Sequence, residues 1–228
     1  MKTEVYLIRH GETMFNQLNK VQGWCDSPLT VRGIDDLKKT AKALSQVYFD
    51  NMYSSDLKRA IDTVHLMKNF NQVSEIGKIR KLPEFREVFF GSFEGDDIDE
   101  TWSQIGIAAG LKPGLDVEQI VKTVGVEKFR QASKDADPRH LAENKAEIDA
   151  RMKRAIANLH HLSKDEGRVL LVSHGDFIKS LAVQYWIKSD HVHDIAFPDN
   201  GSITRGILSE NGDFEIIDYN LKASEFNI

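Results

Sequence analysis

The sequence predicts an α/β fold: a three-layer α/β/α sandwich with a mostly parallel central sheet, an antiparallel edge and a helical insertion. Short apolar runs alternate along the chain with longer segments of helical periodicity, which is typical of a parallel sheet covered by helices. The run at 168–173 is apolar through its centre, as expected for a strand that is buried on both faces. The last two strand-like runs flank a turn and predict the antiparallel edge. We expect a single domain over residues 1–228.

The first half of the chain contains two places where a predicted strand leads into a predicted helix. Residues Val5–Ile8 are β-branched, aromatic or aliphatic, and the polar residues Arg9-His10-Gly11 end this predicted strand. Apolar residues recur at helical spacing from Gly33 to Val47 and predict an amphipathic helix. Residues 51–55 predict a short strand and turn, and a second helix is expected from Leu57 to Lys68.

The second half begins with a segment that breaks the alternation. Residues from about 96 to 145 contain an acidic run, several glycines and two short helical stretches. We interpret this segment as an insertion or lid, because a structureless loop of that length is unusual in a compact domain. A long helix is expected at 142–163, and a further helix at 177–186 should follow the buried strand. Strands at 202–208 and 214–219 should form a hairpin.

Composition limits the possible partners. The 228 residues include 30 Lys and Arg against 35 Asp and Glu, and the net charge of −5 disfavours a general nucleic-acid or anionic-membrane surface. The single cysteine, Cys25, excludes a disulfide or a thiolate cluster within one chain. The sequence contains no apolar run long enough to suggest a membrane segment or a secretion signal. We therefore expect a cytoplasmic protein, and composition leaves its oligomeric state open.

Polar side chains follow three of the predicted strands. Arg9 and His10 end the first, residues 54–59 follow the second, and Ser173 and His174 end the third. Ligands of open α/β sheets bind at the carboxyl ends of the strands, so these residues should converge. Arginine and histidine donors can hold a dianionic phosphoryl group without a metal ion, and a neutral histidine can attack phosphorus.

Five segments, in order along the chain, resemble the signature of the histidine phosphatase superfamily, which includes the cofactor-dependent phosphoglycerate mutases. The resemblance spans about Val5 to Ser202 and is more specific than a single Arg-His-Gly would be. The segments are Leu7–Thr13 with Asn16, Gln22–Thr30, Ser54–Ala60 with Thr63, Glu87–Gly95 and Val172–Gly175.

The resemblance implies a role for each matching residue. His10 would be the nucleophile that becomes phosphorylated, and Glu87 would be the general acid that later activates water. The neighbouring phenylalanines could raise the pKa of Glu87 by desolvation. The transferred phosphoryl group would be surrounded by Arg9, Arg59 and His174. The substrate-binding residues would be Asn16, Gln22, Gly23 and Gly175.

Two of these assignments have alternatives at this stage. Glu84 and Glu94 lie close to Glu87 in the sequence, and the choice of Glu87 depends on the family spacing to Gly91. Arg59 could instead be a solvated helix residue that pairs with a neighbouring carboxylate.

The role of Asp176 is also open, because this acidic residue directly follows the His174-Gly175 motif. It could cap a helix that begins near Phe177. Alternatively, its negative charge could discriminate against substrates that carry a second phosphate.

The sequence favours a metal-independent phosphomonoester phosphatase that acts on a small organic phosphate through a phosphohistidine. A phosphoglycerate mutase needs further cations for its acidic substrate, whereas Glu87 is followed here by Val88-Phe89-Phe90 and then by acidic residues. The alternatives are such a mutase and a non-catalytic phosphate-binding protein. No cofactor or metal is expected; His191 and His193 alternate as a metal pair would, but no third ligand is evident.

Overall fold

The computed structural model describes residues 2–163, 167–186 and 195–226, so His191 and His193 lie outside the described residues. Within these ranges the strands form one six-stranded sheet in the order β3-β2-β4-β1-β5-β6. β1, β4, β2 and β3 are parallel neighbours, whereas β5 runs antiparallel to β1 and to β6. The mostly parallel sheet with an antiparallel edge is confirmed. The strands are β1 Thr3–Arg9, β2 Asn51–Ser54, β3 Arg80–Lys81, β4 Arg168–Ser173, β5 Ile203–Leu208 and β6 Phe214–Leu221.

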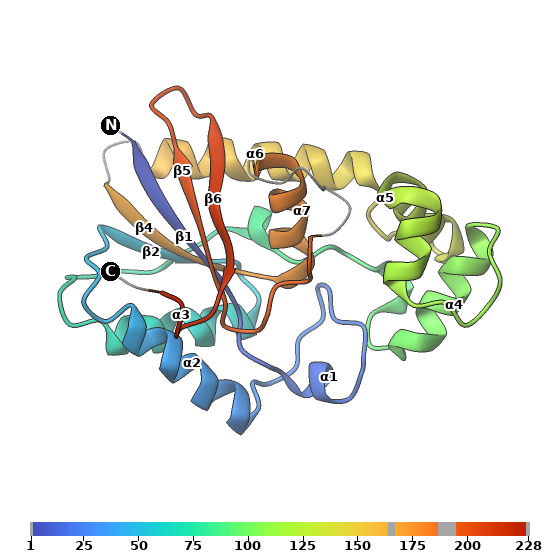
Figure 1. Ribbon diagram of the computed structural model, residues 1–228, viewed down its shortest axis with the longest axis horizontal. Coiled ribbons are helices and arrows are strands. Elements are labelled where there is room, and N and C mark those ends of the chain that lie inside the picture. The colour runs from blue at the N-terminus through green and yellow to red at the C-terminus, as the bar shows by residue number, and fades with distance from the viewer. Residues whose placement is uncertain (1, 164–166, 187–194, 227–228) are drawn as a thin grey trace.

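Helices cover both faces of the sheet and complete the three predicted layers (Figure 1). One face carries α2 (Val31–Ala43) and α3 (Lys58–Phe70), and the other carries α6 (Lys145–Ser163) and α7 (Gly175–Tyr185). Successive strand residues point to opposite faces, so Tyr6 and Ile8 of β1 join one hydrophobic core while Val5 and Leu7 join the other.

The predicted helix at 33–47 is shorter at its C-terminal end than expected. α2 begins after Thr30, whose side chain accepts a hydrogen bond from Gly33 N, and it ends at Ala43. Leu44 and Val47 match the apolar spacing of a helix because both are buried in the core, but they lie in a turn after the helix has ended. The Asn71 side-chain amide donates to their carbonyl groups at 3.2 and 2.8 Å and stabilises this turn.

The start of α7 shows that the interpretation of Asp176 as a helix cap is wrong. The helix begins at Gly175, two residues earlier than predicted, and His174 is its N-cap residue. Asp176 therefore lies in the first turn instead of capping the helix. The prediction erred because the glycine after the histidine signalled a loop, although it occupies the first helical position.

The segment at 96–145 contains α4 (Ile98–Ala108) and α5 (Val117–Ala136), which lie beyond the sheet at the end toward which β1 runs (Figure 1). Asp97 of the acidic run caps α4, and Asp116 caps α5. The second helix is longer than predicted and bends at Gly125, whose φ is 81°. We call residues 96–144 the insertion. None of the helices in the described ranges is long and apolar enough to cross a membrane.

Several short elements were not predicted. They are the two-residue strand β3, α1 (Met14–Gln17) and two 3₁₀ turns, Pro83–Phe85 and Gly91–Phe93. Each is too short to show a period in the sequence. The two turns shape the loop that carries Glu87, between β3 and α4.

Candidate active site

The strand ends that were expected to converge lie side by side. Arg9 pairs with Ser173 in the β1–β4 register, and Ser54 at the end of β2 pairs with Val172. His10 and His174 therefore follow adjacent strands, and their ring centroids are 5.1 Å apart. The two predicted histidines thus share one buried site at the carboxyl edge of the sheet.

The hydrogen bonds of His10 define which ring nitrogen is free to react. Nδ1 lies 2.8 Å from the carbonyl oxygen of Gly11, which can only accept, so we assign the proton to Nδ1. Nε2 then carries the lone pair, and Arg59 Nε donates to it at 3.2 Å. Burial, followed by the positive charges of Arg59 and Arg9, lowers the pKa of His10 well below its usual 6.5. At neutral pH this ring is an uncharged imidazole whose lone pair, on Nε2, accepts the hydrogen bond from Arg59.

Arg59 is fully buried and is held by the loop at 22–26. Its Nη2 donates to the Gly23 carbonyl at 2.7 Å, and Nη1 donates to the Asp26 carboxylate at 2.8 Å. In the orientation of the Gln22 amide that satisfies both of its ends, the nitrogen donates to the hydroxyls of Thr13 and Ser27, and the oxygen accepts from Arg59 Nε at 2.9 Å. The solvated-helix alternative is therefore wrong for Arg59: the exposed carboxylate of Asp62 is taken by Lys58.

Two buried side-chain nitrogens near His10 have no partner among the described residues: Nε of Arg9, which is a donor, and Nδ1 of His174, which is a donor when Nε2 accepts from the Ser55 hydroxyl. Arg9 is anchored through Nη1, which donates to the Pro198 carbonyl at 2.6 Å, and His174 Nε2 lies 2.6 Å from the Ser55 hydroxyl. Buried polar atoms are normally satisfied, so unpaired donors beside His10 suit an anionic ligand. Burial lowers the pKa of Arg9 to about 10, and its guanidinium stays protonated at neutral pH.

The pKa of His174 is also lowered well below its usual value, mainly by burial and then by Arg59 and His10. Without an anion in the site, its ring is neutral at neutral pH. A bound phosphoryl dianion would favour the charged ring, because opposite charges raise the pKa of an imidazole.

Glu87 is buried at the N-terminus of α7. One of its carboxylate oxygens accepts from Phe177 N at 2.8 Å and the other from Asp176 N at 3.0 Å. The backbone hydrogen bonds from Asp176 and from Val88, which donates at 2.9 Å, lower the pKa of Glu87, whereas burial and the negative charge of Asp176 raise it. Burial is the largest of these effects, and the pKa is raised above its usual 4.5. The pKa of Glu87 is therefore shifted in the direction that a general acid requires.

The carboxylate of Glu94, one of the competitors of Glu87, has a different place. It accepts hydrogen bonds from the backbone N–H groups of Gly23, Trp24 and Cys25 at 2.9 to 3.0 Å. These bonds hold the loop that carries the Arg59 acceptors. Among the three glutamates considered from the sequence, Glu87 is the one bonded to the helix that His174 caps.

The loop around Glu87 is held from α6 by an ion pair that the sequence did not suggest. Arg151, which is 6% exposed, pairs with Glu143 at 2.6 Å. The same guanidinium donates to the backbone carbonyls of Arg86 and Glu87 at 2.8 and 3.1 Å. Glu143 in turn accepts from Phe89 N at 2.9 Å. This buried pair fixes the backbone on both sides of Glu87.

The predicted glycines lie where a side chain would not fit. A Cβ at Gly175 would stand 2.4 Å from the Phe197 ring and 2.9 Å from Arg9 Nε, and one at Gly23 would stand 2.3 Å from the Val88 carbonyl. Both glycines let the backbone approach the residues around the site closely.

Asn16 lies on α1 and is linked to the site through a residue that sequence reasoning missed. Asn200 donates to the Asn16 side-chain oxygen at 3.4 Å and to the His10 carbonyl at 3.0 Å. Asn200 and Ser55 could not be singled out, because one lies in an ordinary turn and the other is one of several small polar residues after β2. Their positions depend on contacts between distant segments.

The sequence matches the histidine phosphatase superfamily (branch 1) over residues 5–110 and 105–222. The chain belongs to this superfamily. It is similar to the solved phosphoglycerate mutase from Bacillus anthracis str. Sterne, with a TM-score of 0.86, 28% identity, and coverage of 99% of this chain and 95% of that one.

The similar curated proteins have more than one activity. A 2,3-bisphosphoglycerate-dependent phosphoglycerate mutase from Buchnera aphidicola subsp. Baizongia pistaciae is 38% identical over 105 residues, which is 45% of either protein. The fructose-2,6-bisphosphatase TIGAR from Xenopus laevis is 28% identical over 214 residues, covering 84% of this chain and 76% of that protein. Membership of the superfamily therefore does not distinguish a phosphatase from a mutase, and the distinction must come from the residues of the site.

Proposed function

We propose that the protein is a metal-independent phosphomonoester phosphatase that forms a phosphohistidine on His10 and acts on a small organic phosphate. In the first step, the lone pair on His10 Nε2 attacks phosphorus as the bond to the ester oxygen breaks, and Glu87 gives its proton to the leaving oxygen. In the second step, water attacks phosphorus as the P–N bond breaks, and the Glu87 carboxylate takes a proton from that water. Phosphate leaves and His10 regains its lone pair.

The charges around His10 support both steps. Phosphoryl transfer spreads negative charge over the equatorial oxygens, so donors that are already in place stabilise the transition state. Arg9 and Arg59 supply permanent positive charge, while Nδ1 of His174 has no partner in the part of the chain that the structure describes. Because Nδ1 of His10 already donates to Gly11, attack through Nε2 needs no change of tautomer.

One observation favours hydrolysis over the mutase reaction: the additional arginines near Glu87 are neutralised by carboxylates. Arg86 pairs with Asp56 at 2.5 Å, and the two other pairs join Arg130 to Asp176 and Arg151 to Glu143. A mutase must retain an acidic acceptor while the phosphoryl group returns to it, which calls for unpaired cations. These three arginines are already occupied, so glycerate would be held weakly and water would resolve the intermediate.

The test compares phosphate release with isomerisation in one assay. The protein is incubated with 3-phosphoglycerate, with and without 2,3-bisphosphoglycerate, and separately with 4-nitrophenyl phosphate. We expect phosphate release that is unaffected by a chelator and absent in His10→Ala, with little formation of 2-phosphoglycerate. Isomerisation faster than phosphate release would establish a mutase. Phosphate binding without either reaction would establish a non-catalytic protein.

A further inference from the structure

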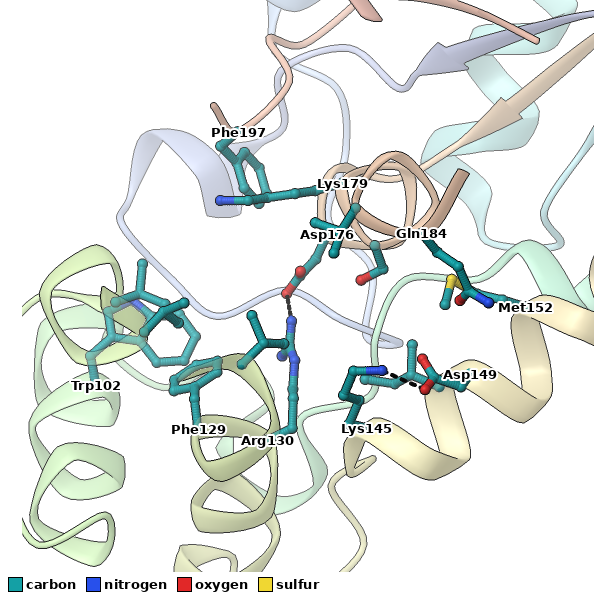
Figure 2. Close-up of a pocket in the computed structure, with 16 residues that line it drawn as sticks. Trp102, Phe129, Arg130, Lys145, Asp149, Met152, Asp176, Lys179, Gln184 and Phe197 are labelled. Carbon is teal, nitrogen blue, oxygen red and sulfur yellow. Dashed lines mark hydrogen bonds and ion pairs between the residues drawn. The ribbon is translucent and has the colours of Figure 1, made fainter. Parts of the chain in front are cut away.

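A cavity of about 330 Å³ lies between the insertion and the helices α6 and α7, which we call the insertion pocket (Figure 2). Its volume is at the lower end of small-molecule sites, so it has room for a compact organic group. Most of its lining is apolar and comes from α4, α5, α6 and α7. The apolar side chains include Trp102, Val121, Phe129, Ile148, Met152 and Val183.

Two residues of the insertion pocket also contact the candidate active site. Asp176 lines the pocket, and its backbone N–H is bonded to the Glu87 carboxylate. Phe197 lines the pocket too, and the guanidinium of Arg9 lies 4.8 Å from the centre of its ring. The pocket therefore begins beside the proposed acid and beside a proposed phosphate-binding arginine. An organic group on the oxygen that Glu87 protonates could extend directly into it.

The pair formed by Arg130 and Asp176 crosses the middle of the pocket, joining α5 to α7 (Figure 2). Its N–O distance is 2.5 Å, and the two side chains are 6% and 19% exposed. Arg130 Nη1 is buried and has no partner among the described residues. The arginine thus offers an unused donor, but its charge is already balanced by Asp176.

The electrostatics around Arg130 and Asp176 disfavour a second anionic group on the ligand in this part of the pocket. Such a group would be close to Asp176 and would compete with it for Arg130, and burying it unpaired is costly. Lys145 is also taken, by Asp149 at 2.5 Å. Lys179, the other cation of the lining, lies beside Phe197 rather than beside Trp102 and Phe129 (Figure 2). An uncharged oxygen could still accept from Arg130 Nη1.

We propose that the insertion pocket binds the organic part of the substrate, and that this part is an apolar group with at most an uncharged oxygen. This deepens the proposed function and rests on it. The substrate class is thus a monophosphate ester of an apolar alcohol, and the pair of Arg130 and Asp176 selects against bisphosphates and phosphorylated acids.

The first test compares two esters with similar leaving-group chemistry, 2-(1-naphthyl)ethyl phosphate and ethyl phosphate. We expect kcat/KM to be at least tenfold higher for the naphthyl ester in the wild type. Val183→Trp should reduce that ratio about tenfold by filling the pocket, and Ser180→Trp is a second variant should the first fail to fold. The matched control is Val73→Trp, because Val73 is 41% exposed in the turn after α3. This control should leave the ratio unchanged.

The second test uses charge. Asp176→Asn frees the Arg130 guanidinium, and it should raise kcat/KM for 3-phosphoglycerate relative to ethyl phosphate by about tenfold. The double variant with Arg130→Met should lose this gain. Equal ratios for wild type, Val183→Trp and Asp176→Asn in both comparisons would overturn the proposal.

A binding measurement separates failure of the pocket from failure of the phosphatase. The non-hydrolysable 3-(1-naphthyl)propylphosphonate should bind the wild type more tightly than propylphosphonate, and Val183→Trp should reduce this difference. If the wild type hydrolyses neither ester but the binding difference is found, the proposed function fails and the pocket assignment stands. Hydrolysis of both esters without a binding difference gives the opposite result.

Discussion

The phosphate end of the site and the insertion pocket are built in different ways. The phosphate end takes Arg9, His10 and His174 from the ends of two adjacent strands, and the register of β1 with β4 fixes their spacing. The insertion pocket takes its lining from four helices and one loop that are far apart in the sequence. We infer that the sheet determines where phosphorus is held, whereas the insertion determines which organic group can accompany it. Substitutions in the two regions should therefore change different kinetic quantities.

The largest expected effect concerns Glu87, at the boundary between the two regions. Glu87→Gln removes the proton donor, so kcat for an alkyl phosphate should fall by about 10²- to 10⁴-fold. With 4-nitrophenyl phosphate, whose leaving group needs no proton, the variant should still phosphorylate His10. It should release a burst of one nitrophenolate per active site and then turn over slowly. Stopped-flow absorbance measures this burst, and a proportional loss of both phases would contradict the assigned role.

The pH profile of the same variant provides an internal control. In the wild type, kcat/KM for ethyl phosphate should fall as pH rises through the raised pKa of Glu87, because only the protonated acid can donate. The value of kcat/KM should also fall at acid pH, where His10 becomes protonated, and this limb should lie below the usual histidine pKa of 6.5. Glu87→Gln should lose the alkaline limb and keep the acid limb. The ionisation of the substrate contributes equally to both profiles, so their difference isolates Glu87.

A smaller effect is expected from the ion pair that holds the Glu87 loop. Arg151→Met leaves the buried Glu143 carboxylate without a counter-ion, and it should lower the free energy of unfolding by about 3 to 5 kcal/mol. Arg151→Met with Glu143→Gln should recover part of this loss, because no lone charge is then buried. Urea denaturation measures both variants.

The control for this prediction is Lys58→Met. Lys58 forms an exposed pair with Asp62, and its loss should cost less than about 1 kcal/mol. Equal destabilisation by Arg151→Met and Lys58→Met would show that the buried pair does not support the Glu87 loop.

These contrasts correspond to what could and could not be predicted from the sequence. His10 and His174 were accessible because each follows an apolar run after one polar residue that ends the strand, and a strand end fixes the position of the next residue. Arg130 and Arg151 were not accessible, since both lie on helices whose periodicity reveals the apolar face but not the partner of a charged residue. Asp176 was noticed, yet its partner on α5 is 46 residues away in the sequence, and only the folded position of the insertion relative to α7 brings the two together.

The proposal that His10 carries the phosphoryl group can be tested most directly by trapping it. Glu87→Gln is mixed with 4-nitrophenyl phosphate, denatured in alkali during the burst to preserve phosphohistidine, digested and analysed by mass spectrometry. We predict one phosphoryl group on His10, formed at the rate of the burst, and none in the double variant with His10→Ala. Nitrophenolate release without modification of the protein, or a phosphoryl group on His174 or Ser55, would contradict the assignment of His10 as the nucleophile.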